Sequence, residues 1–328
     1  MNIYDIAKEA GVSIATVSRV LNNKGTVSAA TRARVEVILK QNNYTPSAIA
    51  RGMVSKSMRT VAVLTVDIRV PHYARTAYTI EREFSRRGYE VILCNTGGDR
   101  AETLRYLQAV NRKQVDGIVL VGSVFDTICQ GAEMEKLLSG VPVVLANGKL
   151  DLPNTYSVTV DDKYGVSLAV EHLVARGRKN IYYIKDRDTD SAKAKRDGFL
   201  EVMRRNGLAF ADHVLEAGET LEDAIDAMQA LLAQGIVPDG IVCGEDLTAA
   251  GALKALLRAG LRVPGQVAVV GFNNSDYAHL CEPVLTSVDN KPEQVALLCV
   301  QLLESRIERS EAYSSVVLQP ELAQGETS

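Results

Sequence analysis

The chain has 328 residues, a formal net charge of −3 at pH 7, 46% hydrophobic and 23% charged residues, and no tryptophan. This composition is typical of a globular chain with more than one domain, and it excludes a disordered, collagen-like or disulfide-rich protein. The sequence contains no run of 18 apolar residues and no signal-peptide pattern, so we expect a cytoplasmic protein with no membrane partner.

No motif in the sequence points to a metal, a cofactor or catalysis. The five cysteines and four histidines lack metal-ligand spacing, and no CxxC, GxGxxG, P-loop or GxSxG pattern occurs. Most of the cysteines lie in or near apolar runs, as buried thiols of a reducing compartment do. We therefore expect no catalytic residue, no metal ligand and no cofactor, and a protein that is not an enzyme.

Residues 1–45 are predicted to form three short helices. Asn2 can cap the first helix with Asp5 at its third position, and Gly11 can end it in the left-handed conformation. Ser13 and Ser28 are suitable caps for the second and third helices. Apolar residues recur at helical spacing in all three, as Ile3, Ile6, Ala7 and Ala10, then Val17, Val20 and Leu21, then Val35, Ile38 and Leu39. This pattern predicts a helix-turn-helix unit.

The charge of the N-terminal segment supports a DNA-binding role. Residues 1–59 hold nine basic and three acidic residues, a net charge of +6, and since the whole chain is −3, residues 60–328 carry −9. A positive segment of this kind attracts DNA phosphates. The alternative is a structural three-helix unit with a solvated basic face.

The motifs of this segment resemble those of the LacI–GalR family of bacterial transcription regulators. The matching runs are Tyr4-Asp5-Ile6-Ala7, Ala10-Gly11-Val12-Ser13, Ala15-Thr16-Val17-Ser18-Arg19-Val20-Leu21-Asn22 and Tyr44-Thr45-Pro46-Ser47. Val115-Asp116-Gly117-Ile118 and Val269-Val270-Gly271-Phe272 extend the resemblance through the rest of the chain. The recognition helix is most similar to that of the catabolite control protein branch.

The resemblance implies a set of DNA contacts. Ile14, Ala15 and Arg19 match positions that meet base edges, where an arginine paired to guanine is worth roughly 1–3 kcal/mol of discrimination. The complete set of expected DNA-binding residues is Tyr4, Ser13, Ile14, Ala15, Thr16, Ser18, Arg19, Asn22, Tyr44, Arg51 and Met53.

Residues 46–58 are expected to form a hinge. The resemblance implies a helix that orders on DNA and inserts an apolar side chain between base steps of the minor groove, a position that Met53 occupies here. Gly52 weakens such a helix by roughly 1 kcal/mol relative to alanine. A plain flexible linker is the alternative interpretation.

The remaining residues, 59–328, alternate strand-like and helix-like segments, which predicts an α/β core with parallel sheets. The expected strands are 61–67, 90–95, 116–121, 142–146, 157–160, 180–184, 240–243, 267–272 and 285–288, and helices include 74–88, 102–113, 162–176, 192–206, 221–234 and 247–260. The resemblance implies a core like that of periplasmic binding proteins, with three chain crossings. Its subdomains are expected at about 59–158 plus 290–313 and at about 159–289 plus 314–328.

Several polar residues follow the predicted strands, where the loops of parallel sheets gather around a ligand. Together with the resemblance, this places effector contacts at Tyr73, Asn147, Ser191, Lys195, Glu245 and Asn273. Asp246 follows the same strand as Glu245. Relatives typically carry arginine and aspartate at the positions of Lys195 and Asn273, so sugar recognition does not transfer directly. Each residue also has a structural interpretation: Lys195 as a surface lysine, the asparagines as turn formers, and Tyr73 as packing.

Three interpretations of the cleft stay open: a small polar effector (a sugar or related metabolite), a protein co-repressor, or a merely structural cleft. Gln301 stands where the catabolite control branch carries its key arginine, which argues against the co-repressor. No C-terminal heptad follows residue 320, so we expect a homodimer that binds a pseudo-palindromic double-stranded operator. A solute-binding protein or an α/β enzyme with a similar core is the alternative function.

Overall fold

The computed structural model describes residues 2–21, 25–42, 57–310 and 315–328. The chain divides into two compact units, residues 1–59 and 60–328. The expected hinge at 46–58 lies outside the described residues except for its last two, so its helix remains a prediction.

The described residues of the first unit form three helices around a small apolar core. They are α1 (Ile3–Ala10), α2 (Ile14–Leu21) and α3 (Ala29–Gln41). Asn2 and Asp5 form the expected capping box, and Gly11 ends α1 with φ +64°. Ser13 and Ser28 accept hydrogen bonds from the N–H groups of Thr16 and Thr31, both at 3.2 Å. The predicted apolar stripes meet in the core, with Ile6, Val17 and Val35 fully buried. The helix-turn-helix prediction is confirmed.

The second unit contains two six-stranded sheets. Sheet 1 has the order β11-β5-β4-β3-β1-β2 and is entirely parallel. Sheet 2 has the order β12-β10-β9-β8-β6-β7 and is parallel except for the antiparallel edge strand β12. The strands are β1 (Thr60–Thr65), β2 (Glu90–Asn95), β3 (Gly117–Val121), β4 (Val143–Ala146), β5 (Thr155–Val160), β6 (Ile181–Lys185), β7 (Val214–Glu216), β8 (Gly240–Cys243), β9 (Ala268–Phe272), β10 (Thr286–Asp289), β11 (Ser315–Leu318) and β12 (Glu321–Ala323).

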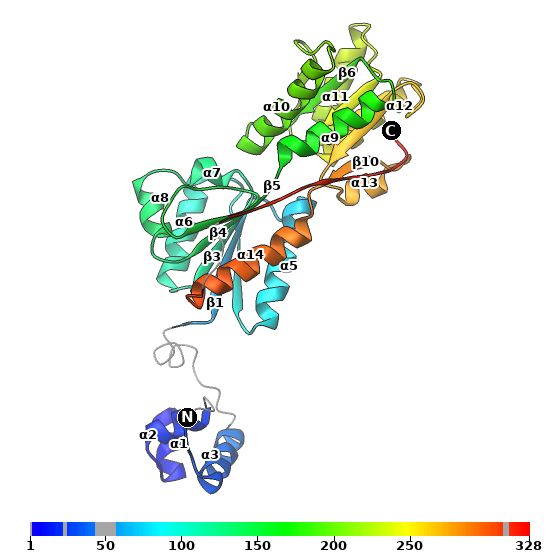
Figure 1. The fold of residues 1–328 in the computed structure, drawn as a ribbon. Coiled ribbons are helices and arrows are strands. Elements are labelled where there is room, and N and C mark those ends of the chain that lie inside the picture. Colours follow the sequence, from blue (N-terminus) through cyan, green and yellow to red (C-terminus); the bar gives the residue numbers. More distant parts are fainter. Residues whose placement is uncertain (1, 22–24, 43–56, 311–314) are drawn as a thin grey trace. The chain divides into compact units, whose positions relative to one another are not determined.

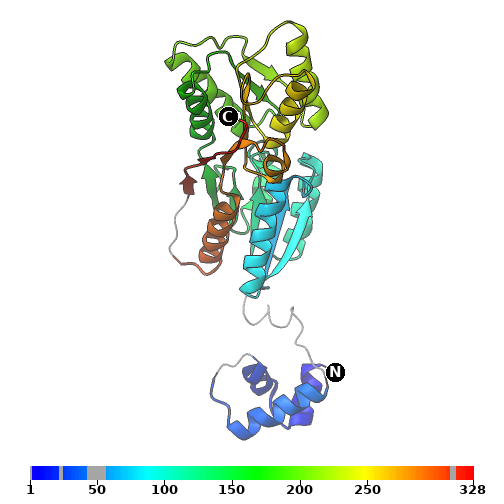
Figure 2. The same cartoon turned by 90° about the vertical axis from the view of Figure 1, so that its right-hand side faces the viewer.

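Helices cover both faces of each sheet (Figures 1 and 2). On sheet 1, α5 (Pro71–Arg86) and α14 (Pro292–Ile307) pack together on one face, while α6 (Arg100–Arg112) contacts α8 (Ala132–Leu138) on the other. On sheet 2, α9 (Asp162–Ala175) pairs with α10 (Asp190–Arg205), and α11 (Leu221–Ala233) with α12 (Asp246–Arg258). The short helices α7 (Phe125–Ile128) and α13 (Asp276–Leu280) complete the set of described helices.

The chain passes between the two sheets three times, as expected: between β5 and α9, between β10 and α14, and between β11 and β12. The last crossing differs from the expected boundary, which placed all of 314–328 with the second subdomain. Strand β11 instead pairs with β5 at the edge of sheet 1. Only the residues after it join sheet 2, where β12 pairs with β10. A run as short as Val316–Leu318 carries no sequence signal for which of two parallel sheets it will extend.

The nine predicted strands are present, with ends that shift by up to two residues, and β7, β11 and β12 are additional. Helix α5 begins three residues earlier than predicted because Pro71 suits the first helical turn. In both sheets, the carboxyl ends of the parallel strands face the boundary between the two subdomains. This arrangement positions the pocket described below.

Candidate functional site

The exposed face of α2 carries most of the predicted base-reading side chains. Ile14 is 39% exposed, and Ala15 and Arg19 are also exposed, whereas Val17 and Val20 are buried against the other helices. The Ser13 and Thr16 hydroxyls lie 3.0 Å apart, so both stand at the helix start with a shared hydrogen bond. A helix with one apolar and one polar face of this kind can enter a major groove.

The other predicted DNA contacts divide into two groups. Tyr4 is 67% exposed on α1, and Ser18 is partly buried on α2. Asn22, Tyr44, Arg51 and Met53 lie outside the described residues. A Cβ atom added to Gly25, whose φ is +73°, would lie 3.4 Å from Cδ of Arg19, so the stem of the arginine rests near this glycine.

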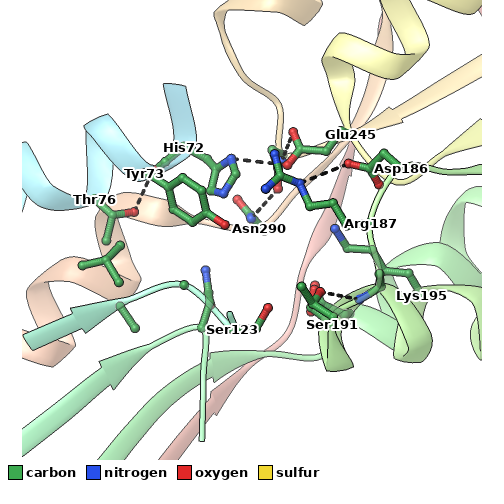
Figure 3. Close-up of a pocket in the computed structure, with 18 residues that line it drawn as sticks. His72, Tyr73, Thr76, Ser123, Asp186, Arg187, Ser191, Lys195, Glu245 and Asn290 are labelled. Carbon is green, nitrogen blue, oxygen red and sulfur yellow. Dashed lines mark hydrogen bonds and ion pairs between the residues drawn. The ribbon is translucent and has the colours of Figure 1, made fainter. Parts of the chain in front are cut away.

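In the second unit, all six residues predicted to contact an effector line one pocket (Figure 3). Its interior offers about 50 Å³ to the centre of a water-sized group, and the space not filled by atoms is about 600 Å³ when the open solvent at its mouth is included. Tyr73 comes from α5 of the first subdomain, and Lys195 and Glu245 come from the second. The further lining residues are His72, Thr76, Val121, Gly122, Ser123, Ala146, Asp162, Asp186, Arg187, Thr189, Ala192 and Asn290.

Lys195 is a pocket residue and not a surface lysine, since its exposed fraction is only 8%. Its ammonium donates a hydrogen bond to the carbonyl oxygen of Gly244 at 2.9 Å and lies 3.8 Å from the centre of the Phe272 ring. The cation is thus held by a backbone dipole and an aromatic face at the floor of the pocket.

Glu245, Asn273 and Asn290 form a hydrogen-bonded chain beside it. Asn273 donates through Nδ2 to Oε2 of Glu245 at 2.9 Å and accepts from Nδ2 of Asn290 at 2.6 Å. His72 Nδ1 lies 3.5 Å from Oε1 of Glu245, across the boundary between the subdomains. Burial lowers the pKa of His72 to about 3, so the imidazole is neutral, and burial raises the pKa of Glu245.

Asn147 and Asn273 are also turn formers. Both have positive φ, +56° and +99°, at the ends of β4 and β9. The structural and the pocket-lining interpretations therefore hold together, because the left-handed residue that ends a strand also directs its amide into the pocket.

Arg187 and Asp186 were not among the predicted site residues. Nε of Arg187 lies 3.4 Å from Oδ2 of Asp186, and its Nη2 lies 3.2 Å from Oε2 of Glu219. Burial raises the pKa of Asp186, which Arg187 and Lys195 partly counteract. These residues directly follow β6, so the strand-end rule that identified Asn147 and Glu245 could have found them as well.

Asp162 is a second carboxyl group that sequence reasoning missed. It lies in the first turn of α9, and its Oδ2 accepts a hydrogen bond from the Ser191 hydroxyl at 2.6 Å. Burial raises its pKa, while Lys195 and the Ser191 hydroxyl act in the opposite direction. The hydrogen bond fixes the predicted residue Ser191 against α9.

Asp246, in contrast, does not line the pocket. It is fully buried behind Glu245, where it accepts hydrogen bonds from the Ser275 N–H at 2.6 Å and from the Ser287 hydroxyl at 2.5 Å. Its carboxylate therefore holds the loop after β9 in place.

Within residues 2–21, 25–42, 57–310 and 315–328, no group of His, Cys, Asp or Glu is arranged to hold a metal ion. No helix in these ranges is long and apolar enough to cross a membrane.

Comparison with known proteins decides the family. Residues 2–47 match the family model of bacterial regulatory proteins of the lacI family, and residues 170–328 match a periplasmic binding protein-like domain. An HTH-type transcriptional regulator of Lachnoclostridium phytofermentans is 34% identical over 92% of both chains. The chain belongs to the lacI family of bacterial regulatory proteins. It is a DNA-binding transcription regulator.

Two further comparisons show similarity along nearly the whole chain. Catabolite control protein A of Priestia megaterium is 33% identical over 98% of this chain and 96% of that protein. The lac repressor dimer bound to operator and the anti-inducer ONPF shares the fold, with a TM-score of 0.88, 24% identity, and coverage of 100% and 98% of the two chains. Both similarities run through the head and the core, in agreement with the resemblance seen in the sequence.

Proposed function

We propose that this regulator is a repressor whose affinity for a pseudo-palindromic operator is set by a small polar molecule in the core pocket. The observation that carries the proposal is the convergence of Tyr73, Asn147, Ser191, Lys195, Glu245 and Asn273 on one cavity between two subdomains. A ligand there contacts both subdomains, so it can favour one relative arrangement over another through differential affinity. The regulator acts in the cytoplasm, where bacterial operators lie.

We further propose that the regulator acts as a homodimer. One head reads only a few base pairs, so two heads on successive major grooves are needed for an operator. In the core, large apolar side chains are exposed on α5, β2 and α13, namely Tyr78, Leu93 and Leu280, at 58%, 43% and 81%. We propose that some of these side chains contribute to the contact between the two subunits. Sedimentation at micromolar concentration should give a dimer, and a tetramer or a monomer would contradict this.

The DNA-binding part is tested by selection of bound sequences from random DNA with the full-length regulator. We expect a pseudo-palindrome with a flexible central step, into which Met53 inserts from the hinge. Met53→Ala should then weaken operator binding, and an unchanged affinity would refute the insertion of Met53 between base steps. If no two-fold symmetric site is recovered, the proposal that a homodimer binds the operator is refuted.

The effector part is tested by a thermal-shift screen of sugars, nucleosides and other polar metabolites, followed by operator binding with and without each hit. A hit that raises the melting temperature and changes operator affinity supports the proposal. A protein co-repressor is the second candidate, but α14 carries the neutral Gln301 at the surface position that a charged contact would need. Operator affinity that no small molecule changes would favour this second candidate.

A further inference from the structure

The pocket carries more carboxyl groups than cations. Its lining includes Asp162, Asp186 and Glu245 against Lys195 and Arg187, and His72 is neutral. Glu219, outside the pocket and 59% exposed, pairs with Arg187. The lining therefore carries one more acidic than basic side chain in a buried environment, where charge is costly unless it is paired.

Both cations are already engaged. Arg187 lies between Asp186 and Glu219, and Lys195 donates to the Gly244 carbonyl above the Phe272 ring. Among the described residues, no basic side chain lies within 4.0 Å of Asp162, whose recorded side-chain partner is the neutral Ser191 hydroxyl. A negatively charged ligand would have to approach these carboxyl groups, and its cationic partners would be the remaining N–H groups of Lys195 and Arg187 or, in the adjoining recess, Lys149.

Two amide carbonyl groups of the pocket also lack donors. Oδ1 of Asn290, a residue only 5% exposed, and Oδ1 of Asn147 are buried without a hydrogen-bond partner among the described residues. A buried acceptor without a donor is destabilising, and natural proteins rarely leave one unsatisfied. Both atoms belong to residues that line the cavity, and a ligand donor would reach them after a small side-chain movement. Nε of Arg187 is a buried donor without a hydrogen-bond partner in the same lining.

The aromatic rings of the site are not available to stack on a sugar. The Tyr73 ring lies 3.9 Å from the His72 ring, centre to centre, and a Cβ added to Gly122 would lie 2.8 Å from Cε1 of Tyr73. Lys195 occupies a face of Phe272. The apolar face of a pyranose therefore finds no free ring, which favours recognition by charge and hydrogen bonds.

We propose that the ligand of this pocket carries a protonated amine and that Asp162 accepts it. An ammonium group supplies three donors and one positive charge, which matches the one surplus acidic group of the lining and the carbonyl groups without donors. Asp162, Asn147, Ser123 and Ser191 line both this pocket and an adjoining recess, so the amine lies where the two cavities meet. The inference rests on the proposed function, in which this pocket holds the effector.

The test compares charge-matched probes on the full-length regulator by calorimetry near neutral pH. The sets are D-glucosamine, D-glucose and D-glucuronate, then 2-amino-1,3-propanediol, glycerol and glycerate, then 4-amino-1-butanol, 1,4-butanediol and 4-hydroxybutyrate. We expect an amine to bind best within its set, about tenfold or more tighter than its neutral analogue, because a charged donor strengthens the hydrogen bond to Asp162. A neutral or anionic probe that binds best, or no amine that binds at all, overturns the inference.

Variants assign the amine to its partner. Asp162→Asn should remove the preference for the amine, while Asp190→Asn should keep it. Asp190 lines the recess but not the inner pocket and already pairs with Lys193 at 3.0 Å, so its loss changes the net charge by the same amount. The charge-matched probe series on the unaltered regulator keeps the test decisive where Asp162→Asn does not fold. A preference that Asp162→Asn keeps, or that Asp190→Asn loses, contradicts the assignment.

Operator binding is measured in parallel. If a neutral or anionic hit changes operator affinity, the proposed function stands and the amine inference fails. If no ligand of any charge changes operator affinity, the proposed function itself fails.

Discussion

The ammonium of Lys195 lies 3.8 Å from the centre of the Phe272 ring and donates to the carbonyl oxygen of Gly244 at 2.9 Å. Its positive charge lowers the pKa of the Asp162 and Glu245 carboxyl groups, against the effect of their burial. A lysine in this position is part of the pocket lining, and its charge favours the ionised form of two buried acids.

Lys195→Met should therefore destabilise the core. The substitution keeps most of the side-chain volume but leaves the Gly244 carbonyl without its donor and the carboxyl groups without their cation. We expect the free energy of unfolding in urea to fall by about 1–3 kcal/mol. Lys193→Met, two residues earlier, removes only an exposed ion pair with Asp190 and should change stability by less than about 0.5 kcal/mol. Equal losses in the two variants would contradict the role of Lys195.

Arg19→Ala should weaken binding to the selected operator by about ten- to hundredfold, since an arginine paired to guanine is worth roughly 1–3 kcal/mol. The melting temperature of the head should change little, because Arg19 is exposed on α2. Fluorescence anisotropy with operator and scrambled DNA gives the measurement. Arg34→Ala removes the same charge from an exposed position on α3 and should lower both affinities alike. Loss of specificity in the second variant, or its retention in the first, would refute the assignment.

Asp126 predicts a pH dependence of stability. Burial raises its pKa from about 3.8 to about 7; the Lys149 N–H, which donates to Oδ1 at 2.7 Å, opposes the shift, and Asp190 adds to it. Between these values the folded chain holds a proton that the unfolded chain has released, so the free energy of unfolding falls as pH rises through this window. Above about pH 7 the free energy of unfolding has lost the full amount that the buried Asp126 carboxylate costs. Asn at this position keeps an acceptor for Lys149 and carries no charge.

The gain in melting temperature from Asp126→Asn should therefore be larger at pH 8 than at pH 5. Asp151→Asn, an exposed change on a neighbouring loop, provides the control and should show no such difference. A gain for Asp126→Asn that is the same at both pH values would show that the carboxyl group titrates as it does in the unfolded chain.

The sequence was most informative where a residue type is forced by backbone geometry. The caps at Asn2 and Ser28 and the left-handed Gly11 predicted the head, and asparagines that end β4 and β9 predicted pocket residues. The same reasoning missed Asp186 and Arg187, which follow β6, because acidic and basic residues after a strand also occur on solvated loops.

Other features cannot be derived from local pattern. The three-residue strands β7 and β12 are too short to show a period, and their pairing depends on which edge is open. Asp162 and Ser191 are separated by 29 positions, and their hydrogen bond depends on the packing of α9 against α10. The cation of Lys195 is directed inward by the Gly244 carbonyl, a backbone group that no sequence motif marks.

Asn273→Asp would introduce the residue that the family resemblance implies at this position, and the pocket predicts that it is unfavourable here. Nδ2 of Asn273 donates to Glu245 at 2.9 Å, and a carboxylate would instead face Glu245 with like charge. At pH 8 we expect a loss of about 1–3 kcal/mol in the free energy of unfolding. Near pH 5 the two carboxyl groups can share a proton, which restores a donor, so the loss should shrink. Asn154→Asp makes the same chemical change at an exposed residue with φ +61°, whose Nδ2 donates to the Ser139 carbonyl oxygen at 3.2 Å, so its cost should be smaller and should change little between the two pH values. A penalty at Asn273 that does not depend on pH would show that lost packing, and not charge repulsion with Glu245, governs this site.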